Sequence, residues 1–177
     1  MGFNGRRREC DQLDERILNL VQGNNRLTSE QIGEQVGLSS TACQRRLKRL
    51  RQSGVIEADV SIVDPEAAGF RLQMLVQVTL VRDRWDIVDR FKRAIRSAPE
   101  VMHGYYVTGD TDFILAVSAR DMAAYEEFAR SFLYENPDVE TFKTMVVVDR
   151  VKAGFLLPFE DETTDKTGRR WSAAERR

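Results

Sequence analysis

The chain has 177 residues, enough for two small domains, and its 42% hydrophobic and 31% charged residues are typical of a globular protein in water. No apolar run reaches the roughly 18 residues of a membrane-spanning helix, and no apolar core follows the first arginines as in a signal peptide, so we expect a cytoplasmic protein with no membrane partner. Two cysteines far apart and a single histidine predict no disulfide and no metal site, and they count against a histidine-assisted nucleophile, although carboxylate catalysis stays open. We expect no cofactor and no enzymatic activity.

The first part of the chain predicts two short helices after a polar arm. Residues 1–10 have no apolar pattern and are expected to form a flexible arm. From Leu13 on, apolar residues recur at spacings of three and four, which predicts an amphipathic helix that stops at the turn of residues 23–25. Thr28 and Gln31 then form a capping-box pair, which predicts the start of a second helix.

A third helix is expected after a tight turn at Gly37, where glycine tolerates the backbone conformation and a following serine caps the helix. Cys43, Leu47 and Leu50 recur on one side of this helix, which predicts the side that packs inward. The opposite side then presents hydrogen-bonding side chains, as the second helix of a helix-turn-helix does toward the major groove of DNA. We expect DNA contacts from Ser39, Ser40, Thr41, Gln44, Arg45, Lys48 and Arg49.

These side chains suit different contacts with double-stranded DNA. Gln44 matches adenine and Arg45 matches guanine, whereas Lys48 and Arg49 lie further along the helix and suit phosphates. Arg46 falls between the two faces and is expected to hold either a phosphate or an acidic residue of the first helix. The net charge of −1 does not indicate a polyanion, but residues 38–56 include several arginines and no acidic residue. A solvated helix face would produce the same basic stretch.

The rest of the chain predicts a different architecture. Residues 55–63 alternate enough to form a strand, strands are also expected at 72–81, 101–108, 113–119 and 141–151, and helices are expected at 83–97 and after Asp121. The order β-α-β-β-α-β is that of a ferredoxin-like unit. The sequence thus predicts an α+β protein with an arm at 1–10, a helix-turn-helix domain at 11–55, a linker strand at 56–70, a ferredoxin-like domain at 71–158 and a charged tail at 159–177.

Both halves of the sequence resemble one family. Residues 13–69 include Leu-Asp…Ile-Leu, a Gly-Leu-Ser turn, Arg-Arg-Leu-x-x-Leu and Gly-x-Ile, in the order found in the DNA-binding half of the Lrp/AsnC (feast/famine) transcription regulators. The segments VMHGYYVTGDTDFILAVSARDMAAYEEF and VVVDRVK are similar to the effector-sensing half of that family. The resemblance covers about residues 13–157. It implies a sequence-specific transcription regulator with a three-helix, winged helix-turn-helix.

The resemblance also implies partners and a second site. Family members form homodimers through their ferredoxin-like domains, assemble further into tetramers or octamers, and bind an amino acid or a related metabolite between dimers. The matching positions of the effector site are Thr108, Gly109, Asp110, Thr111, Asp112, Met122, Met145, Val146 and Val147. The N–H groups of a glycine turn suit the carboxylate of an amino acid, and Asp110 or Asp112 suits its ammonium group. The same residues would also serve simply to build a hairpin turn, with Asp112 capping it.

Two other functions stay open from the residues alone. The helical domain would bind a protein instead of DNA if its basic face were an ordinary solvated surface. The ferredoxin-like domain would be an enzyme if its carboxylates acted as catalysts, although the chain lacks a phosphate-binding glycine loop and a thiol pair. The arginines at 6–8 and in the tail suit phosphates or solvent equally well.

Overall fold

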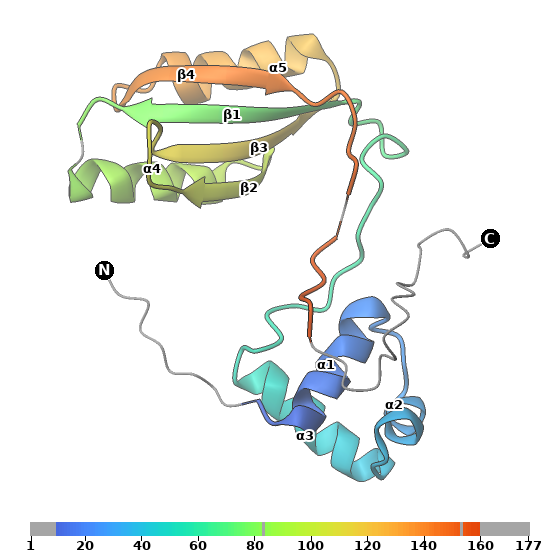
Figure 1. The fold of residues 1–177 in the computed structure, drawn as a ribbon. Coiled ribbons are helices and arrows are strands. Elements are labelled where there is room, and N and C mark those ends of the chain that lie inside the picture. Colours follow the sequence, from blue (N-terminus) through green and yellow to red (C-terminus); the bar gives the residue numbers. More distant parts are fainter. Residues whose placement is uncertain (1–9, 83, 153, 160–177) are drawn as a thin grey trace. The chain divides into compact units, whose positions relative to one another are not determined.

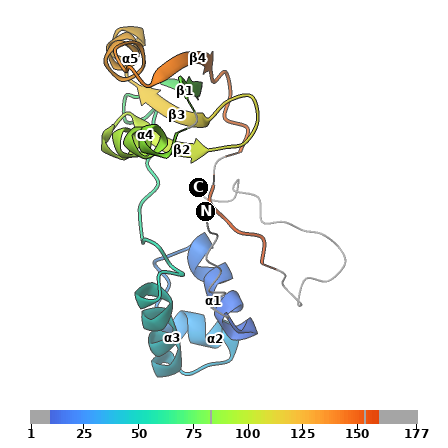
Figure 2. The same cartoon turned by 90° about the vertical axis from the view of Figure 1, so that its left-hand side faces the viewer.

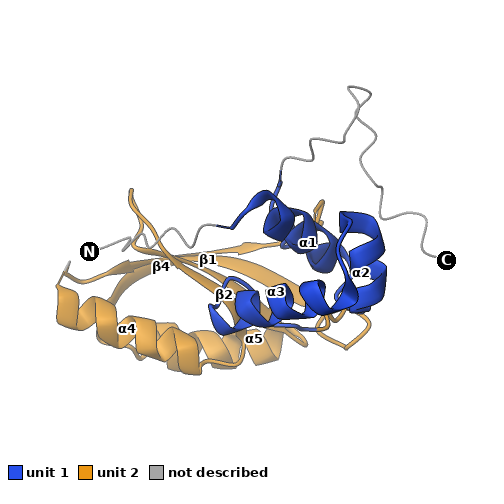
Figure 3. Ribbon diagram, turned by 90° about the horizontal axis from the view of Figure 1, so that it is seen from below, with its two compact units in different colours: residues 1–60, 153–177 blue, residues 61–152 orange. Residues whose placement is uncertain are grey.

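The computed structural model describes residues 10–82, 84–152 and 154–159 (Figure 1). The chain divides into two compact units, one made of residues 1–60 and 153–177 and the other of residues 61–152 (Figure 3). Apart from Cys10 and Phe159, the predicted arm and tail lie outside the described residues. The first unit is therefore discontinuous in sequence: residues 154–158, which we expected in the ferredoxin-like domain, group with the helical unit, as does Phe159.

The first unit consists of three helices, α1 (Gln12–Gly23), α2 (Ser29–Val36) and α3 (Ser40–Gln52). Asp11 and Thr28 cap α1 and α2 through reciprocal capping boxes, and Ser39 caps α3. The predicted three-helix arrangement is confirmed. The apolar sides of the helices meet in one core, formed by Ile17, Leu18, Ile32, Val36, Cys43, Leu47 and Leu50.

The linker strand predicted at 55–63 does not form. No described residue of the helical unit belongs to a strand. The strands that would form the wing of a winged helix-turn-helix are therefore not seen among these residues. Val60, Ile62 and Val63 are exposed, and no strand of the described residues offers them N–H and C=O groups for a ladder. An alternating pattern is insufficient where the backbone has no partner.

The turn between α2 and α3 depends on two glycines. Gly37 ends α2 in the left-handed conformation, with a φ of 74°. The carbonyl of Gly33 accepts hydrogen bonds from the N–H groups of Gly37 and Leu38 at 2.8 and 3.0 Å. A Cβ atom at position 33 would lie 2.4 Å from the carbonyl oxygen of Leu38. That oxygen belongs to the backbone, so the turn itself would have to shift.

Replacing Gly33 with alanine is therefore expected to lower the free energy of unfolding of the helical unit by about 1–3 kcal/mol. Gly23→Ala is the matched control, because a Cβ atom at this helical position meets nothing within 4 Å. Alanine should raise stability there by about 0.4–1 kcal/mol. Urea unfolding followed by hydrogen exchange in α1–α3 measures both changes, and equal midpoints for the two variants would contradict this account of the turn.

The second unit is a four-stranded antiparallel sheet with two helices on one face (Figure 2). The strands are β1 (Leu72–Leu80), β2 (Val101–Tyr106), β3 (Phe113–Ala119) and β4 (Val139–Val146), and they lie in the order β2-β3-β1-β4. The helices are α4 (Trp85–Ser97) and α5 (Met122–Ala129), and α5 continues into a π-helical turn, η1 (Arg130–Tyr134). The predicted α+β, ferredoxin-like βαββαβ order is confirmed.

The last strand begins and ends earlier than its valines predict. We expected a strand at 141–151, but the ladder of β4 with β1 runs from Val139 to Val146. Val146 pairs with Met74, close to the first residue of β1, so little of β1 remains to pair with later residues. Val148 and Val151 are accordingly 99% and 89% exposed.

Candidate DNA interface and effector site

The outer side of α3 presents the predicted DNA-contacting residues to solvent. Cys43, Leu47 and Leu50 are at most 6% exposed and define the inner side. Gln44, Arg45 and Lys48 are exposed on the opposite side, and among the residues that the structure describes they form no hydrogen bond or ion pair. Of the other predicted contacts, Ser39, Thr41 and Arg49 are exposed and Ser40 is half-buried.

A buried carboxylate on α1 holds two arginines of α3. The side chain of Asp14 is 1% exposed; it accepts a hydrogen bond from Arg46 at 2.8 Å and another from Arg49. Arg46 also donates to Asp11 at 2.7 Å, and this hydrogen bond lowers the pKa of the Asp11 carboxyl. Arg46 was predicted to hold either a phosphate or an acidic residue of the first helix. In the structure it is paired with acidic residues, Asp11 and Asp14.

These ion pairs change the expectation for the basic face of α3. Arg49 was expected to contact phosphate; it is paired with Asp14, although its side chain stays 54% exposed. Arg45 and Lys48 remain the cations of this helix that point to solvent without a described partner. Sequence reasoning did not single out Asp14, and its signal was an acidic residue beside the first apolar position of α1.

The hairpin between β2 and β3 divides the predicted effector residues into two groups. At its base, the Thr111 hydroxyl donates to the carbonyl of Val78 at 2.8 Å, and the Asp112 carboxylate accepts from the N–H of Leu80 at 2.7 Å. These two side chains fasten the hairpin to β1, a structural role for Asp112 that differs from the expected capping of the turn. At its tip, Thr108, Gly109 and Asp110 are exposed, and Gly109 has a φ of 126°. The tip is therefore the part of the hairpin available to a ligand.

The remaining predicted effector residues do not gather around this hairpin in one subunit. The hairpin precedes β3 and Met122 follows it, so they lie at opposite ends of a strand roughly 20 Å long. Met145 lies opposite Leu75 on the sheet face that the helices leave open, whereas Val146 pairs with Met74, which is buried beneath them. The N–H of Val147 donates to the carbonyl of Gln73. One subunit alone therefore does not form the site that the resemblance implies.

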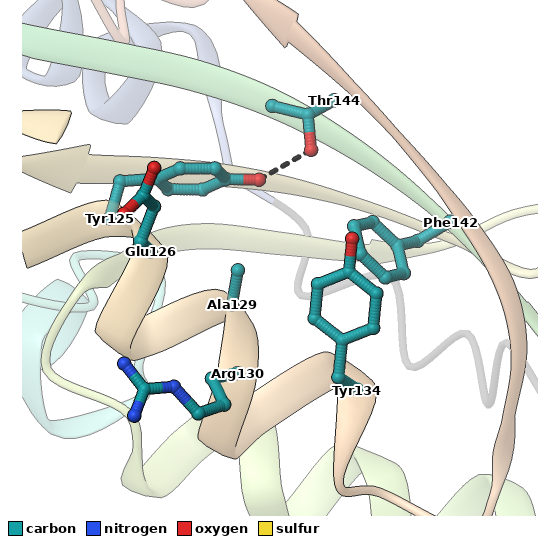
Figure 4. Close-up of a pocket in the computed structure, with 7 residues that line it drawn as sticks. All are labelled: Tyr125, Glu126, Ala129, Arg130, Tyr134, Phe142 and Thr144. Carbon is teal, nitrogen blue, oxygen red and sulfur yellow. Dashed lines mark hydrogen bonds between the residues drawn. The ribbon is translucent and has the colours of Figure 1, made fainter. Parts of the chain in front are cut away.

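A hollow of about 370 Å³ lies between α5, η1 and β4 (Figure 4). The hydroxyls of Tyr125 and Thr144 are hydrogen-bonded across it, and the rings of Tyr134 and Phe142 meet edge-on with their centroids 4.9 Å apart. Sequence reasoning missed this hollow, because a π-helical turn has no clear sequence signal. It is lined by Tyr125, Glu126, Ala129, Arg130, Tyr134, Phe142 and Thr144.

Residues 10–82, 84–152 and 154–159 contain no group of three or more histidine, cysteine, aspartate or glutamate side chains arranged to hold a metal ion. None of the helices within these ranges is both long enough and apolar enough to cross a membrane.

Comparison with known proteins bears on both units. A model for winged helix-turn-helix DNA-binding domains matches residues 11–57, and a model for the Lrp/AsnC ligand-binding domain matches residues 73–157. A curated HTH-type transcriptional regulator of Sinorhizobium fredii is 65% identical over 152 residues, which are 86% of this chain and 90% of that protein. The chain belongs to the Lrp/AsnC family of transcription regulators.

More distant members of the family agree with this assignment. The leucine-responsive regulatory protein of Escherichia coli K12 is 31% identical over 82% of this chain and 88% of its own length. Among solved structures, a transcriptional regulator from Neisseria meningitidis in complex with L-methionine superposes with a TM-score of 0.78 at 31% identity, covering 85% of this chain and 97% of that one. As an Lrp/AsnC regulator, the protein combines a DNA-binding helix-turn-helix with a ligand-binding domain, and it is not an enzyme.

Proposed function

We propose that the protein is a sequence-specific Lrp/AsnC regulator in which α3 reads base edges in the major groove. The observation that supports this most is the exposed, unpaired side of α3. Gln44 and Arg45 stand there without described partners, while Asp14 holds the neighbouring Arg46 and Arg49. A recognition helix must dock firmly and keep its reading side chains free, and α3 meets both requirements.

Titration of a duplex that the protein itself selects from a random library tests this proposal. Affinity followed by fluorescence anisotropy should fall steeply with added salt, because phosphate contacts release counterions. The selected duplex should bind about 10³-fold or more tightly than a scrambled one. Equal affinity for both duplexes, or affinity that does not change with salt, would favour a helical domain that binds another protein.

The open face of the sheet supports a homodimer. Its exposed residues include Leu75, Tyr105 and Met145, and Leu75 lies directly opposite Met145 on neighbouring strands. The helices cover the other face (Figure 2). A cluster of apolar side chains on an uncovered sheet face is typical of a protein interface. A second copy of the same face is the simplest cover, and higher assemblies of tetramers or octamers would build on this dimer.

Replacing Leu75 with glutamate is expected to convert the dimer to monomers, because two like charges would be buried near the centre of the shared face. Ala123→Glu, on the exposed surface of α5, is the matched control and should leave the assembly unchanged. Light scattering during gel filtration measures the mass. A Leu75→Glu protein of unchanged mass would place the interface elsewhere.

We propose further that the effector is an amino acid and that the hairpin tip binds it. The Neisseria meningitidis regulator was solved with L-methionine, which makes this amino acid the first probe. The tip offers exposed backbone at Gly109 and a carboxylate at Asp110. A carboxylate suits the ammonium group of an amino acid, and N–H groups of the turn suit its carboxylate. The other residues of the site would come from a neighbouring subunit.

Two variants separate the hairpin from the hollow beside β4. L-methionine or L-leucine at about 100 times its Kd should stabilise the wild-type protein by about 2.7 kcal/mol in thermal unfolding. Asp110→Asn is expected to lose most of this stabilisation, because the ammonium group loses its counter-charge. Tyr134→Ala, which opens the hollow, should retain it. The opposite outcome would move the effector site to the hollow.

A further inference from the structure

The chain returns to the helical unit after the sheet and is held there by a glutamine. We call residues 154–159 the return segment. The side-chain amide of Gln22 on α1 donates to the carbonyl of Leu157 at 2.8 Å and accepts from the N–H of Leu157 at 2.9 Å. Two residues later, the ring of Phe159 packs against the apolar core of the three helices. The Gln22 amide and the ring of Phe159 both hold the return segment to the helical unit.

The return segment continues directly from the strand that borders the sheet. β4 ends at Val146, and the chain then passes through residues 147–152 to reach Leu157. Met145 and Val147 belong to the predicted effector set and lie at the start of this path. The helical unit is therefore attached to the sensing unit twice, once before β1 and once after β4.

Both hydrogen bonds of the attachment end on α1, the helix that also holds α3. Gln22 lies near the end of α1, and Asp14 in its first turn binds Arg46 and Arg49 of α3. A displacement of Leu157 would therefore act directly on α1, the helix whose Asp14 is ion-paired with α3.

We infer that the return segment is a releasable clamp that transmits effector binding from β4 to the DNA-binding helices. This inference rests on the proposed function. The clamp is suited to switching because residues 154–159 belong to no helix or strand, so their release breaks no element of secondary structure. An effector that binds the two forms unequally would shift the balance between them, and the two forms would hold α1 differently.

Hydrogen exchange at the Leu157 amide tests the clamp without DNA or effector. In the full-length protein this N–H should be protected, because it donates to Gln22. Gln22→Met keeps the size of the side chain and removes both hydrogen bonds, so exchange at Leu157 should rise about tenfold or more. Gln12→Met, at the exposed start of α1, is the matched control and should leave exchange at Leu157 unchanged. A wild-type amide that exchanges as fast as in a peptide would overturn the clamp.

The transmission is tested by the change in DNA affinity that L-methionine or L-leucine produces. Coupling of this kind is typically about 5- to 150-fold in affinity. In Gln22→Met the amino acid should change DNA affinity by no more than about twofold, while the protein still binds the selected duplex. A chain ending at Lys152 lacks the clamp and should behave in the same way, whereas a chain ending at Phe159 keeps the clamp and should respond as the full-length protein does.

The outcomes separate this inference from the proposed function. A wild-type protein that binds no selected duplex would refute the proposed function, and the inference with it. A wild-type protein that responds to the amino acid while Gln22→Met responds equally, despite faster exchange at Leu157, would refute the inference alone. Equal responses of the chains ending at Lys152 and Phe159 would refute it as well.

Discussion

Replacing Asp14 with asparagine is expected to lower the free energy of unfolding of the helical unit by about 3 kcal/mol. The substitution keeps the size of the side chain and removes the one charge that two arginines share. Arg46 and Arg49 would then face a neutral amide in a position that is 1% exposed. Because α3 is held to α1 through this carboxylate, DNA binding should weaken together with stability, while the sheet unit stays folded.

The matched control is Asp11→Asn, which removes a second partner of Arg46. Asp11 is 53% exposed, and asparagine still caps a helix, so the expected loss is below about 1 kcal/mol. Urea unfolding monitored by hydrogen exchange, read separately for α1–α3 and for the sheet, distinguishes the two variants. If both variants lost the same free energy of unfolding, or if the sheet unit were destabilised, Asp14 would not be the residue that holds the helices together.

Replacing Arg45 with alanine is expected to relax base preference by about 10- to 100-fold at one position of the selected duplex. A guanidinium that donates two hydrogen bonds to guanine contributes about 1–3 kcal/mol to discrimination against other bases. Arg45 is exposed and has no partner among the described side chains, so none of these side chains competes with DNA for it. Affinities for a panel of single-base variants of the duplex measure the change.

Lys48→Ala is the companion variant, because Lys48 lies one helical turn further on the same side. It should weaken all duplexes by a similar factor and reduce the slope of log affinity against log salt by about one. An Arg45→Ala protein with unchanged base preference would show that another residue reads the sequence. A Lys48→Ala protein with altered base preference would exchange the roles of the two residues.

The positions of the helices and of most strands can be predicted from the sequence, because apolar periodicity and capping residues determine them locally. Periodic apolar residues and the capping pair of Thr28 and Gln31 predict α2 and the inward side of α3, and the structure agrees. The strands expected at 55–63 and beyond Val146 do not form, although their alternation or valine content favours them. A strand also needs a partner with free backbone groups, and one segment does not reveal where that partner ends.

The site residues divide along the same line. The exposed side of α3 follows from its apolar periodicity, so the exposure of Gln44, Arg45 and Lys48 could be predicted. The pairing of Arg49 with Asp14 and of Gln22 with Leu157 joins residues that are 35 and 135 positions apart, and local pattern has no access to such contacts. The hairpin tip was predictable as a turn, but the fastening of its base to β1 by Thr111 and Asp112 appears only once the strands are paired.

The contact of Phe159 with the three-helix core also bears on biosynthesis. The ribosome makes α1–α3 first, yet the residue that covers part of their apolar surface is added after the whole sheet. A nascent chain should therefore display a half-finished helical domain while the sheet is still emerging, and that domain reaches its final form last. A chain that ends before Phe159 should therefore keep a small apolar surface of the three helices exposed, which raises its tendency to aggregate.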